Sequence, residues 1–310
     1  MPAPTPYRSS RPVRRLLFGL GSLLTILMVL WGSAQALDRL SIEEEHVVRA
    51  YSGVTAIDLR HAHGDVDLVP ARGRRVEVAI DSRHGFLSGH EREDELRAGE
   101  LRLRGSCDFL TIGTCEEHYR IEVPRGVTVA VRTSAGEATA RGLRGDLVLR
   151  SSAGSVRALD VRGDSVELGS HAGSVSATGV RADDLELESR AGGIEVARSS
   201  GRRVLASTAA GSVDVELLTA PSSVDAESRA GAVTVVVPDV GYAVDARTRA
   251  GEERVQIRQR PAGPRTLDVE SRAGDVNVLP LPADARRRRT APARSPERDR
   301  ARAGRAKSPR

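Results

Sequence analysis

Aromatic residues make up only 3% of this 310-residue chain, which also has one tryptophan and two cysteines. A core with so few rings must be built from Val, Leu, Ile and Ala side chains. Sites that cleave polysaccharides usually combine aromatic platforms with clustered carboxylates. The repeated part of this chain has a single aromatic residue, Tyr242, and scattered acidic residues. A polysaccharide-acting β-helix enzyme is therefore only a minor alternative.

The sequence also lacks a phosphate-binding loop, a dinucleotide fingerprint and a metal-ligand motif. We therefore expect no enzyme activity, no catalytic residue, no cofactor and no bound metal. His61 and His63 lie two residues apart on the same side of an expected strand, so a metal site formed by this pair is an alternative to be considered. No third ligand is evident from the spacing, so a packing or capping role is favoured.

The formal net charge of +5 is unevenly spread. Residues 1–15 carry four arginines and no acid, and residues 281–310 carry eleven basic and three acidic residues. Removing the +4 and +8 of these ends leaves about −7 for the chain between them. Residues 281–310 lack apolar periodicity and are expected to be a disordered basic tail. Its four consecutive arginines, 286–289, suit wall teichoic acid, lipid headgroups or nucleic acid.

Residues 16–37 contain no charge, which is long enough for a helix that crosses a hydrocarbon core of about 30 Å. The basic segment 1–15 precedes this run and an acidic linker, 38–47, follows it, so the positive-inside rule predicts a cytoplasmic N-terminus and an extracytoplasmic domain. A cleaved signal peptide is the alternative, because AQA at 34–36 fits a cleavage site. An uncleaved single-pass anchor in the cell membrane is favoured. Both readings export the rest of the chain and argue against nucleic acid as a partner.

Cys107 and Cys115 are the only cysteines. An oxidising compartment outside the membrane favours a disulfide between them. Two unpaired thiols are the alternative. A catalytic cysteine is disfavoured, because no neighbouring His or Asn suggests an activating partner.

An Ala-Gly pair recurs eight times at a nearly fixed period. The spacings between successive glycines are 18, 19, 19, 19, 20, 20 and 23 residues. The glycines are Gly136, Gly154, Gly173, Gly192, Gly211, Gly231, Gly251 and Gly274. A period of this size is typical of a solenoid in which each repeat forms one coil. Each glycine is expected to be a structural corner, where a side chain would not fit and positive φ is allowed.

Within each repeat, apolar residues alternate with polar ones, as in Leu147-x-Leu149-x-Ser151-x-Ala153. Strict alternation predicts strands with one buried face. The Ser/Thr column shares the buried side, so its hydroxyls should bond to neighbouring coils or to the corner backbone. The sequence predicts an all-β parallel β-solenoid of about 19-residue coils over residues 129–280.

Two outward columns flank each corner. If the coils stack in sequence order, Arg247 lies between Glu227 and Glu270. The position before the Ala-Gly pair is often arginine and forms a candidate anion-binding column, which consists of Arg190, Arg229, Arg249 and Arg272. A solvated ladder of charge pairs is favoured over a binding stripe for a polyanionic envelope polymer.

Residues 48–128 contain a weaker first coil and then break the period around the cysteine loop. This segment is expected to be an N-terminal cap that covers the exposed β edge of the solenoid on its membrane side. In the repeat after Gly251, Glu253 replaces the usual valine, which predicts a bulge or a locally opened coil.

An apolar N-terminal segment, a cysteine-bracketed insert and serial S-x-A-G-D-V-x-V repeats with G-D-L-x-L returns resemble the bacterial domain-of-unknown-function family known as putative adhesins. The resemblance covers roughly residues 48–280. It implies a β-solenoid on the cell envelope without established catalytic residues. An adhesive or structural module that contacts anionic envelope polymer is the leading hypothesis, and a sensing or signalling accessory beside another membrane protein is the alternative.

Overall fold

The computed structural model describes residues 20–33, 43–84, 90–107 and 115–282. These residues form one helix, 20–33, and 22 strands, so the prediction of a mostly β chain is confirmed. Among the described residues, no helix has the length and hydropathy needed to span a bilayer. The predicted span 16–37 extends beyond these residues, and the membrane anchor stays a prediction. The basic tail also lies outside them, apart from its first two positions.

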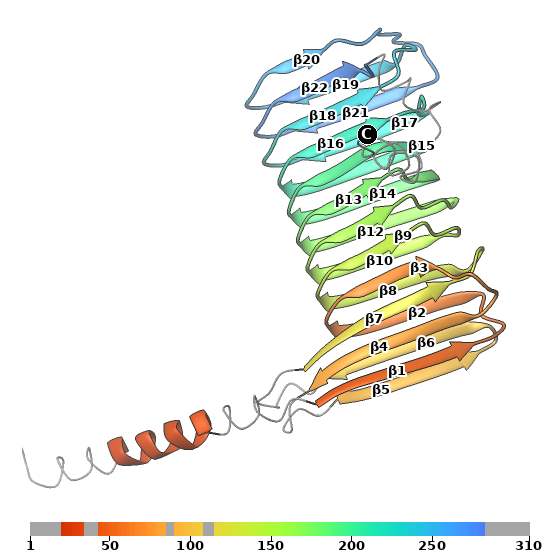
Figure 1. The fold of residues 1–310 in the computed structure, drawn as a ribbon. Coiled ribbons are helices and arrows are strands. Elements are labelled where there is room, and N and C mark those ends of the chain that lie inside the picture. The colour runs from red at the N-terminus through yellow and green to blue at the C-terminus, as the bar shows by residue number, and fades with distance from the viewer. Residues whose placement is uncertain (1–19, 34–42, 85–89, 108–114, 283–310) are drawn as a thin grey trace, which may run out of the picture.

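The strands alternate between two sheets that face each other through the core (Figure 1). One coil consists of a strand of sheet 1, the Ala-Gly corner, a strand of sheet 2 and a return loop. The strands of sheet 1 are β2 (Ala56–His63), β5 (His90–Arg97), β6 (Glu100–Cys107), β8 (Thr128–Ala135), β10 (Leu147–Ala153), β12 (Ser165–Ala172), β14 (Arg181–Ala191), β17 (Ser223–Ser228), β19 (Ala243–Thr248) and β21 (Thr266–Ser271). Those of sheet 2 are β1 (Glu43–Tyr51), β3 (Val66–Pro70), β4 (Val76–His84), β7 (Cys115–Val123), β9 (Ala138–Arg141), β11 (Val156–Leu159), β13 (Val175–Thr178), β16 (Val213–Leu217), β18 (Val233–Val237), β20 (Glu253–Val255) and β22 (Val276–Pro280). The long strand β15 (Ile194–Ala210) continues from sheet 2 into sheet 1.

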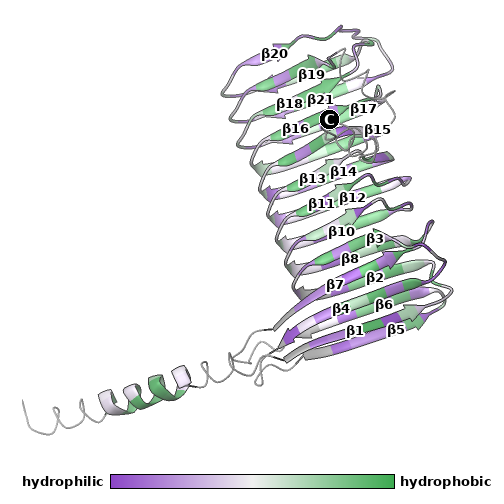
Figure 2. Cartoon of the chain, viewed as in Figure 1, coloured by the Kyte–Doolittle hydropathy of each residue, from purple (hydrophilic) through white to green (hydrophobic). Residues whose placement is uncertain are grey.

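Equivalent residues of successive coils pair in parallel and in register, as Leu149 does with Leu168. Their apolar side chains form continuous buried columns between the sheets, and Leu149, Leu168 and Leu187 are fully buried. Figure 2 shows the resulting alternation of hydrophobic and hydrophilic residues along the strands. One coil has too little apolar surface to fold alone, so stacking supplies the core.

The hydroxyl column is hydrogen-bonded and, apart from the partly exposed Thr248 of the outermost coil, buried, as the alternation predicted. Ser170 donates to the carbonyl of Gly154 at 2.9 Å, and Ser189 donates to that of Gly173 at 3.1 Å. Five other residues of the column make the equivalent bond, in which the hydroxyl donates to the carbonyl of the corner glycine in the adjacent coil: Ser151, Thr208, Ser228, Thr248 and Ser271. Thr133, at the start of the column, instead donates to the carbonyl of Ala135. The column therefore joins neighbouring coils at each corner.

The coils do not stack in sequence order at the C-terminal end. Strand β17 pairs with β21, and β21 pairs with β19, while β18, β22 and β20 repeat this order in sheet 2. The coil formed by β21 and β22 therefore lies between two coils that precede it in the chain. The outermost coil contains β19 and β20, and Figure 1 shows it at the end of the stack.

The irregular repeat after Gly251 is explained by this order. Glu253 pairs in register with Val276 but is exposed, and its carboxylate accepts the backbone N–H of Thr248 at 2.8 Å. A charged residue is tolerated in a core column here because, within the described ranges, the coil of β19 and β20 is not covered by another coil.

At the opposite end, β6 and β7 form an additional coil, and β1, β4 and β5 add antiparallel strands to it. Strand β6 pairs in parallel with β2, and β7 with β3. Beyond them, β5 is antiparallel to β6, β4 to β7 and β1 to β4. The outermost strands β1 and β5 are largely hydrophilic (Figure 2). The cysteines end β6 and begin β7, but their side chains and residues 108–114 lie outside the described residues, so the disulfide stays a prediction.

The N-terminal strands contain ionic contacts of two kinds. Arg92 pairs with the carboxylate of Glu117 at 3.1 Å, and the hydroxyl of Tyr119 donates to the same carboxylate at 3.0 Å, with both Glu117 and Tyr119 buried. Nearer the surface, the Asp94 carboxylate accepts hydrogen bonds from the Arg49 guanidinium and the Tyr51 hydroxyl. These bonds lower the pKa of the Asp94 carboxyl, and the bond from Arg49 has the larger effect. These contacts join β1, β5 and β7.

Candidate functional site

The Ala-Gly corners run along one edge of the stack. All eight predicted corner glycines have positive φ, from 124° at Gly136 to 156° at Gly251. A Cβ at Gly173 would lie 2.3 Å from the carbonyl oxygen of Gly154. The coils therefore approach so closely at this edge that only glycine fits, and each position before the Ala-Gly pair is held at a fixed place beside the next.

The arginines before the corners are brought together by the order of the coils. Because β21 lies between β17 and β19, the spatial order is Arg229, Arg272 and Arg249. Arg272 donates its backbone N–H to the carbonyl of Ser228, and Arg249 donates to that of Ser271. The fourth predicted residue, Arg190, is separated from Arg229 by the coil that contains Ala209.

We call Arg229, Arg272 and Arg249 the corner arginines. All three side chains are exposed. Within the described part of the chain none of them forms an ion pair, and the same holds for Arg190. Neighbouring strands in a sheet lie about 4.8 Å apart, so three guanidinium groups occupy consecutive steps of the stack, and no carboxylate of the described ranges pairs with them.

The predicted position of Arg247 is wrong for the same reason. Glu227 pairs in register with Glu270, and Arg247 lies beyond Glu270. Arg247 forms ion pairs with Asp245 at 3.1 Å and Asp268 at 3.4 Å. The expectation assumed that coils stack in sequence order, whereas the last coil is inserted between the two before it.

This inversion places like charges side by side on the outer face of sheet 1. Asp225 pairs in register with Asp268, next to Glu227 and Glu270. Burial, followed by repulsion from Asp268, Glu227 and Glu270, raises the pKa of the Asp225 carboxyl. An acidic face therefore lies beside the basic corner.

The other predicted site residues are not assembled into a chemical site. His63 is exposed and pairs in register with Ala135, while the side chain of His61 lies outside the described residues. No group of three or more His, Cys, Asp or Glu residues suited to a metal ion occurs among the described residues.

A second alignment of arginines was not predicted. Arg144 pairs in register with Arg162, and Arg162 with Arg181, where the return loops lead back into sheet 1 at the edge opposite the corners; Arg181 is the first residue of β14. The sequence does contain a signal, since LRG, VRG and VRA recur here at offsets of 18 and 19 residues. An alignment on the Ala-Gly pairs alone does not reveal it.

Two solved structures are similar to the chain at low identity. One is a putative adhesin from Bacteroides fragilis, with 15% identity and a TM-score of 0.44 over 76% of this chain and 97% of that one. The other is a putative cell adhesion protein from Clostridium sporogenes, with 11% identity and a TM-score of 0.30 over 77% of this chain and 100% of that one. No curated protein matches the sequence.

The family model described as Toastrack DUF4097 matches residues 54–279, which include all eight corner glycines and every strand from β2 to β21. The match extends over most of the chain and over the stacked coils described above. The chain therefore belongs to the Toastrack DUF4097 family.

Proposed function

We propose that this protein is a non-enzymatic, adhesin-like module of the cell envelope that binds anionic envelope polymer through the corner arginines. The observation that supports the proposal is the juxtaposition of Arg229, Arg272 and Arg249 in consecutive coils. All three are exposed and have no ion pair within the described residues.

Like charges at directly neighbouring positions of a sheet repel each other. A column of three unpaired guanidinium groups therefore gains little from the fold itself and suits an external anion. Guanidinium groups bind phosphate and carboxylate with two parallel hydrogen bonds. A polymer with several anionic groups would contact several steps of the column at once, so that modest individual contacts would add up to useful affinity.

The test measures binding of the full chain, purified in detergent, to isolated envelope polymer over a range of salt concentrations. We expect Arg229→Ala, Arg249→Ala and Arg272→Ala together to weaken binding by at least about tenfold, and added salt to weaken binding of the unmodified protein. The matched control replaces three exposed arginines that do have ion pairs, Arg132, Arg150 and Arg203, which contact Asp58, Glu167 and Asp184. Equal loss in both variants would contradict a specific role for the corner.

We further propose that residues 16–37 anchor the protein as a single span, with the coils outside the cytoplasmic membrane. The charge difference across this segment supports the orientation. Protease added to intact cells or spheroplasts should then cleave the basic tail. Full protection of the tail would contradict this topology, and a mature N-terminus after residue 36 would replace the anchor with a cleaved signal peptide.

A further inference from the structure

A hollow of about 880 Å³ lies at the N-terminal end of the edge opposite the corners. It is formed by the loop before β2, the loop between β3 and β4, and the loop between β7 and β8. Four arginines line it: Arg72, Arg74, Arg75 and Arg125. The remaining lining residues are neutral, so no carboxylate of the residues that the structure describes lines the hollow.

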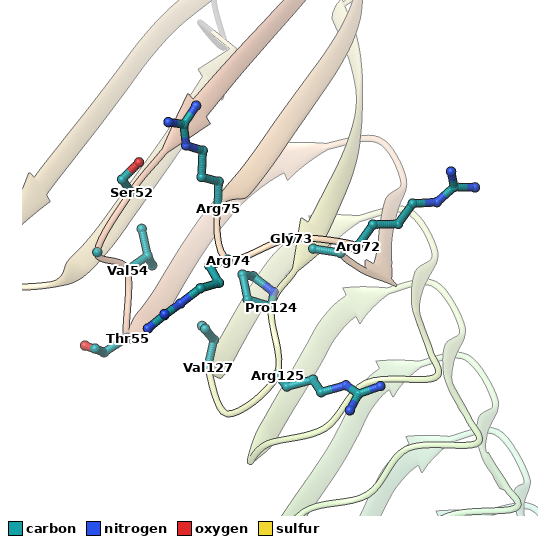
Figure 3. A pocket seen from close by; sticks show the side chains of 12 residues that line it. Ser52, Val54, Thr55, Arg72, Gly73, Arg74, Arg75, Pro124, Arg125 and Val127 are labelled. Carbon is teal, nitrogen blue, oxygen red and sulfur yellow. The ribbon is translucent and has the colours of Figure 1, made fainter.

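The side chains around the hollow are shown in Figure 3. Arg74 crosses it toward Thr55, and Arg75 extends past Ser52. Arg72, from the same loop as Arg74, and Arg125, from the loop between β7 and β8, extend to the right in this view, away from Arg74 and Arg75, so the four guanidinium groups flank the hollow on two sides. Val54, Pro124 and Val127 are buried and form an apolar floor under these exposed polar groups.

The hollow continues into the row of arginines in the return loops. Gly126, next to Arg125, donates its backbone N–H to the carbonyl of Arg144 at 2.7 Å. Arg144, Arg162 and Arg181 then pair in register from coil to coil. Arg125 and these three residues therefore occupy successive steps along the same edge, which we call the return-loop row.

A buried apolar residue directly before each arginine of the row fixes its position on the stack. Leu143, Val161 and Val180 come directly before Arg144, Arg162 and Arg181, and all three are buried. Since successive residues of extended backbone point to opposite sides, the arginines are directed outward, and all three are exposed.

Acidic residues near the row do not neutralise it by direct contact. Asp146 uses its carboxylate to accept the backbone N–H groups of Asp164 and Ser165, both at 3.0 Å. Across the described residues, no ion pair is formed by any arginine of the hollow or of the return-loop row.

We infer that the hollow and the return-loop row form a second anion site, distinct from the corner arginines, that takes a linear, phosphate-rich polymer. The hollow receives one phosphate group, and the row accompanies the rest of the polymer along the stack.

The number of cations favours phosphate. One carboxylate has two acceptor oxygens and is satisfied by a single guanidinium fork. A terminal phosphate group carries nearly two negative charges and three strong acceptor oxygens, so it can accept hydrogen bonds from more than one of the exposed arginines that flank the hollow.

The row favours a polymer over a single small anion. Arg144, Arg162 and Arg181 advance by about 4.8 Å per coil away from the hollow, so one phosphate in the hollow cannot reach them all. A chain of linked phosphates can contact the hollow and the row together, and its affinity should rise with its length.

The experiment measures binding of the full chain in detergent to inorganic polyphosphate, with orthophosphate, polygalacturonate and phosphatidylglycerol vesicles as comparison probes. One variant replaces the hollow arginines by Arg72→Gln, Arg74→Gln, Arg75→Gln and Arg125→Gln. A second replaces the row by Arg144→Gln, Arg162→Gln and Arg181→Gln. The corner variant Arg229→Ala, Arg249→Ala and Arg272→Ala is the matched control. All exchanged side chains are exposed, so the unfolding midpoints should stay close to that of the unmodified protein.

We expect the hollow variant to bind polyphosphate at least about tenfold more weakly, the row variant to lose the dependence on polymer length, and the corner variant to bind as the unmodified protein does. Unchanged binding by the hollow variant overturns the inference, as does binding that only the corner variant loses. If only the corner variant loses binding, the inference about the hollow fails but the proposed function stands. If only the hollow variant loses binding to envelope polymer, the proposed function of the corner arginines fails but the inference about the hollow stands. Equal affinity for polygalacturonate would overturn phosphate selectivity, and binding to vesicles alone would overturn a polymer as the occupant.

Discussion

The hydroxyl of Ser271 donates a hydrogen bond to the carbonyl of Gly231 at 2.9 Å, although 40 residues separate them in the chain. Elsewhere in the regular part of the column this bond spans only 15 to 17 residues. The bond skips the repeat that contains Gly251, and Thr248 of that repeat bonds forward to Gly274. The pattern of hydrogen bonds at the corners thus shows that the coil of β21 and β22, the last in the sequence, lies between the two coils that precede it.

Replacing a corner glycine should destabilise the fold strongly. Gly173→Ala places a methyl group 2.3 Å from the carbonyl oxygen of Gly154 at a φ of 154°. We expect a loss of about 2–4 kcal/mol in the free energy of unfolding, measured by urea denaturation. Gly193→Ala is the control, because its Cβ would meet only ordinary contacts, 3.5 Å from the carbonyl of Ser212. Similar losses for both variants would contradict the steric explanation.

The hydroxyl column should contribute through its hydrogen bonds. Ser189→Ala removes the bond to the carbonyl of Gly173 in a buried position and should cost about 1 kcal/mol in unfolding free energy. Ser189→Thr should retain the stability, since Thr208 occupies the same column in the next coil and makes the equivalent bond. Thermal unfolding of both variants checks this, and a neutral effect of Ser189→Ala would show that the bond adds nothing.

The acidic face should make stability depend on pH. Burial and three neighbouring carboxylates raise the pKa of Asp225, so the folded state binds its proton more tightly than the unfolded state does. The contribution of Asp225 is therefore most favourable below its unfolded pKa and is lost as pH rises through the raised value. Packing removes only part of the water around this carboxyl, and Asp225 as a residue stays exposed, so solvent screens the repulsion. Asp225→Asn should therefore raise the free energy of unfolding at neutral pH by under about 1 kcal/mol and have little effect in acid.

The measurement is the free energy of unfolding of Asp225→Asn and of the unmodified protein, obtained by urea denaturation from acid to neutral pH. Glu195→Gln, which removes an exposed carboxylate from the other sheet, is the matched control. A gain from Asp225→Asn that is equally large in acid would contradict the role of its ionised form.

The buried ion pair of the N-terminal strands should be sensitive to loss of one partner. The side chains of Arg92 and Glu117 are 12% and 3% exposed, and the Arg92 Nε has no hydrogen-bond partner in the described part of the chain. Glu117→Leu leaves the Arg92 charge largely buried and should cost about 3–5 kcal/mol in unfolding free energy. The double variant Arg92→Met with Glu117→Leu should recover much of that loss. A double variant no more stable than Glu117→Leu alone would contradict this account.

The period of two made the coils, the buried columns and the hydroxyl bonds predictable, because each depends only on residues within one repeat. The coil order was not predictable in this way. The apolar residues Val244 and Ala246 occupy the same sequence positions in their repeat as Val224 and Ala226, so either β19 or β21 could follow β17 on apolar pattern alone. Only Glu253, a charge in a core column, indicated that its coil has one uncovered side.

The candidate sites, too, were predictable only where they depend on residues within one repeat, and not where they depend on how the coils and loops are arranged in space. The corner arginines could be found from the repeat alignment, but their spatial order follows from the inverted coil. The hollow combines Arg74 and Arg125 from loops about 50 residues apart, and neither belongs to the aligned repeat. Such a convergence depends on how the N-terminal strands fold back on the first coil, which no local pattern encodes.

The inverted coil also sets an order of events while the chain is being made. When synthesis has passed residue 257, the outermost strands β19 and β20 exist but the two strands they pair with do not. They can take their final place only after β21 and β22 have been added. A chain interrupted between these points would keep an uncovered edge at β17 and β18 and a loose segment beyond it, so this end of the stack is completed only when translation has reached residue 280.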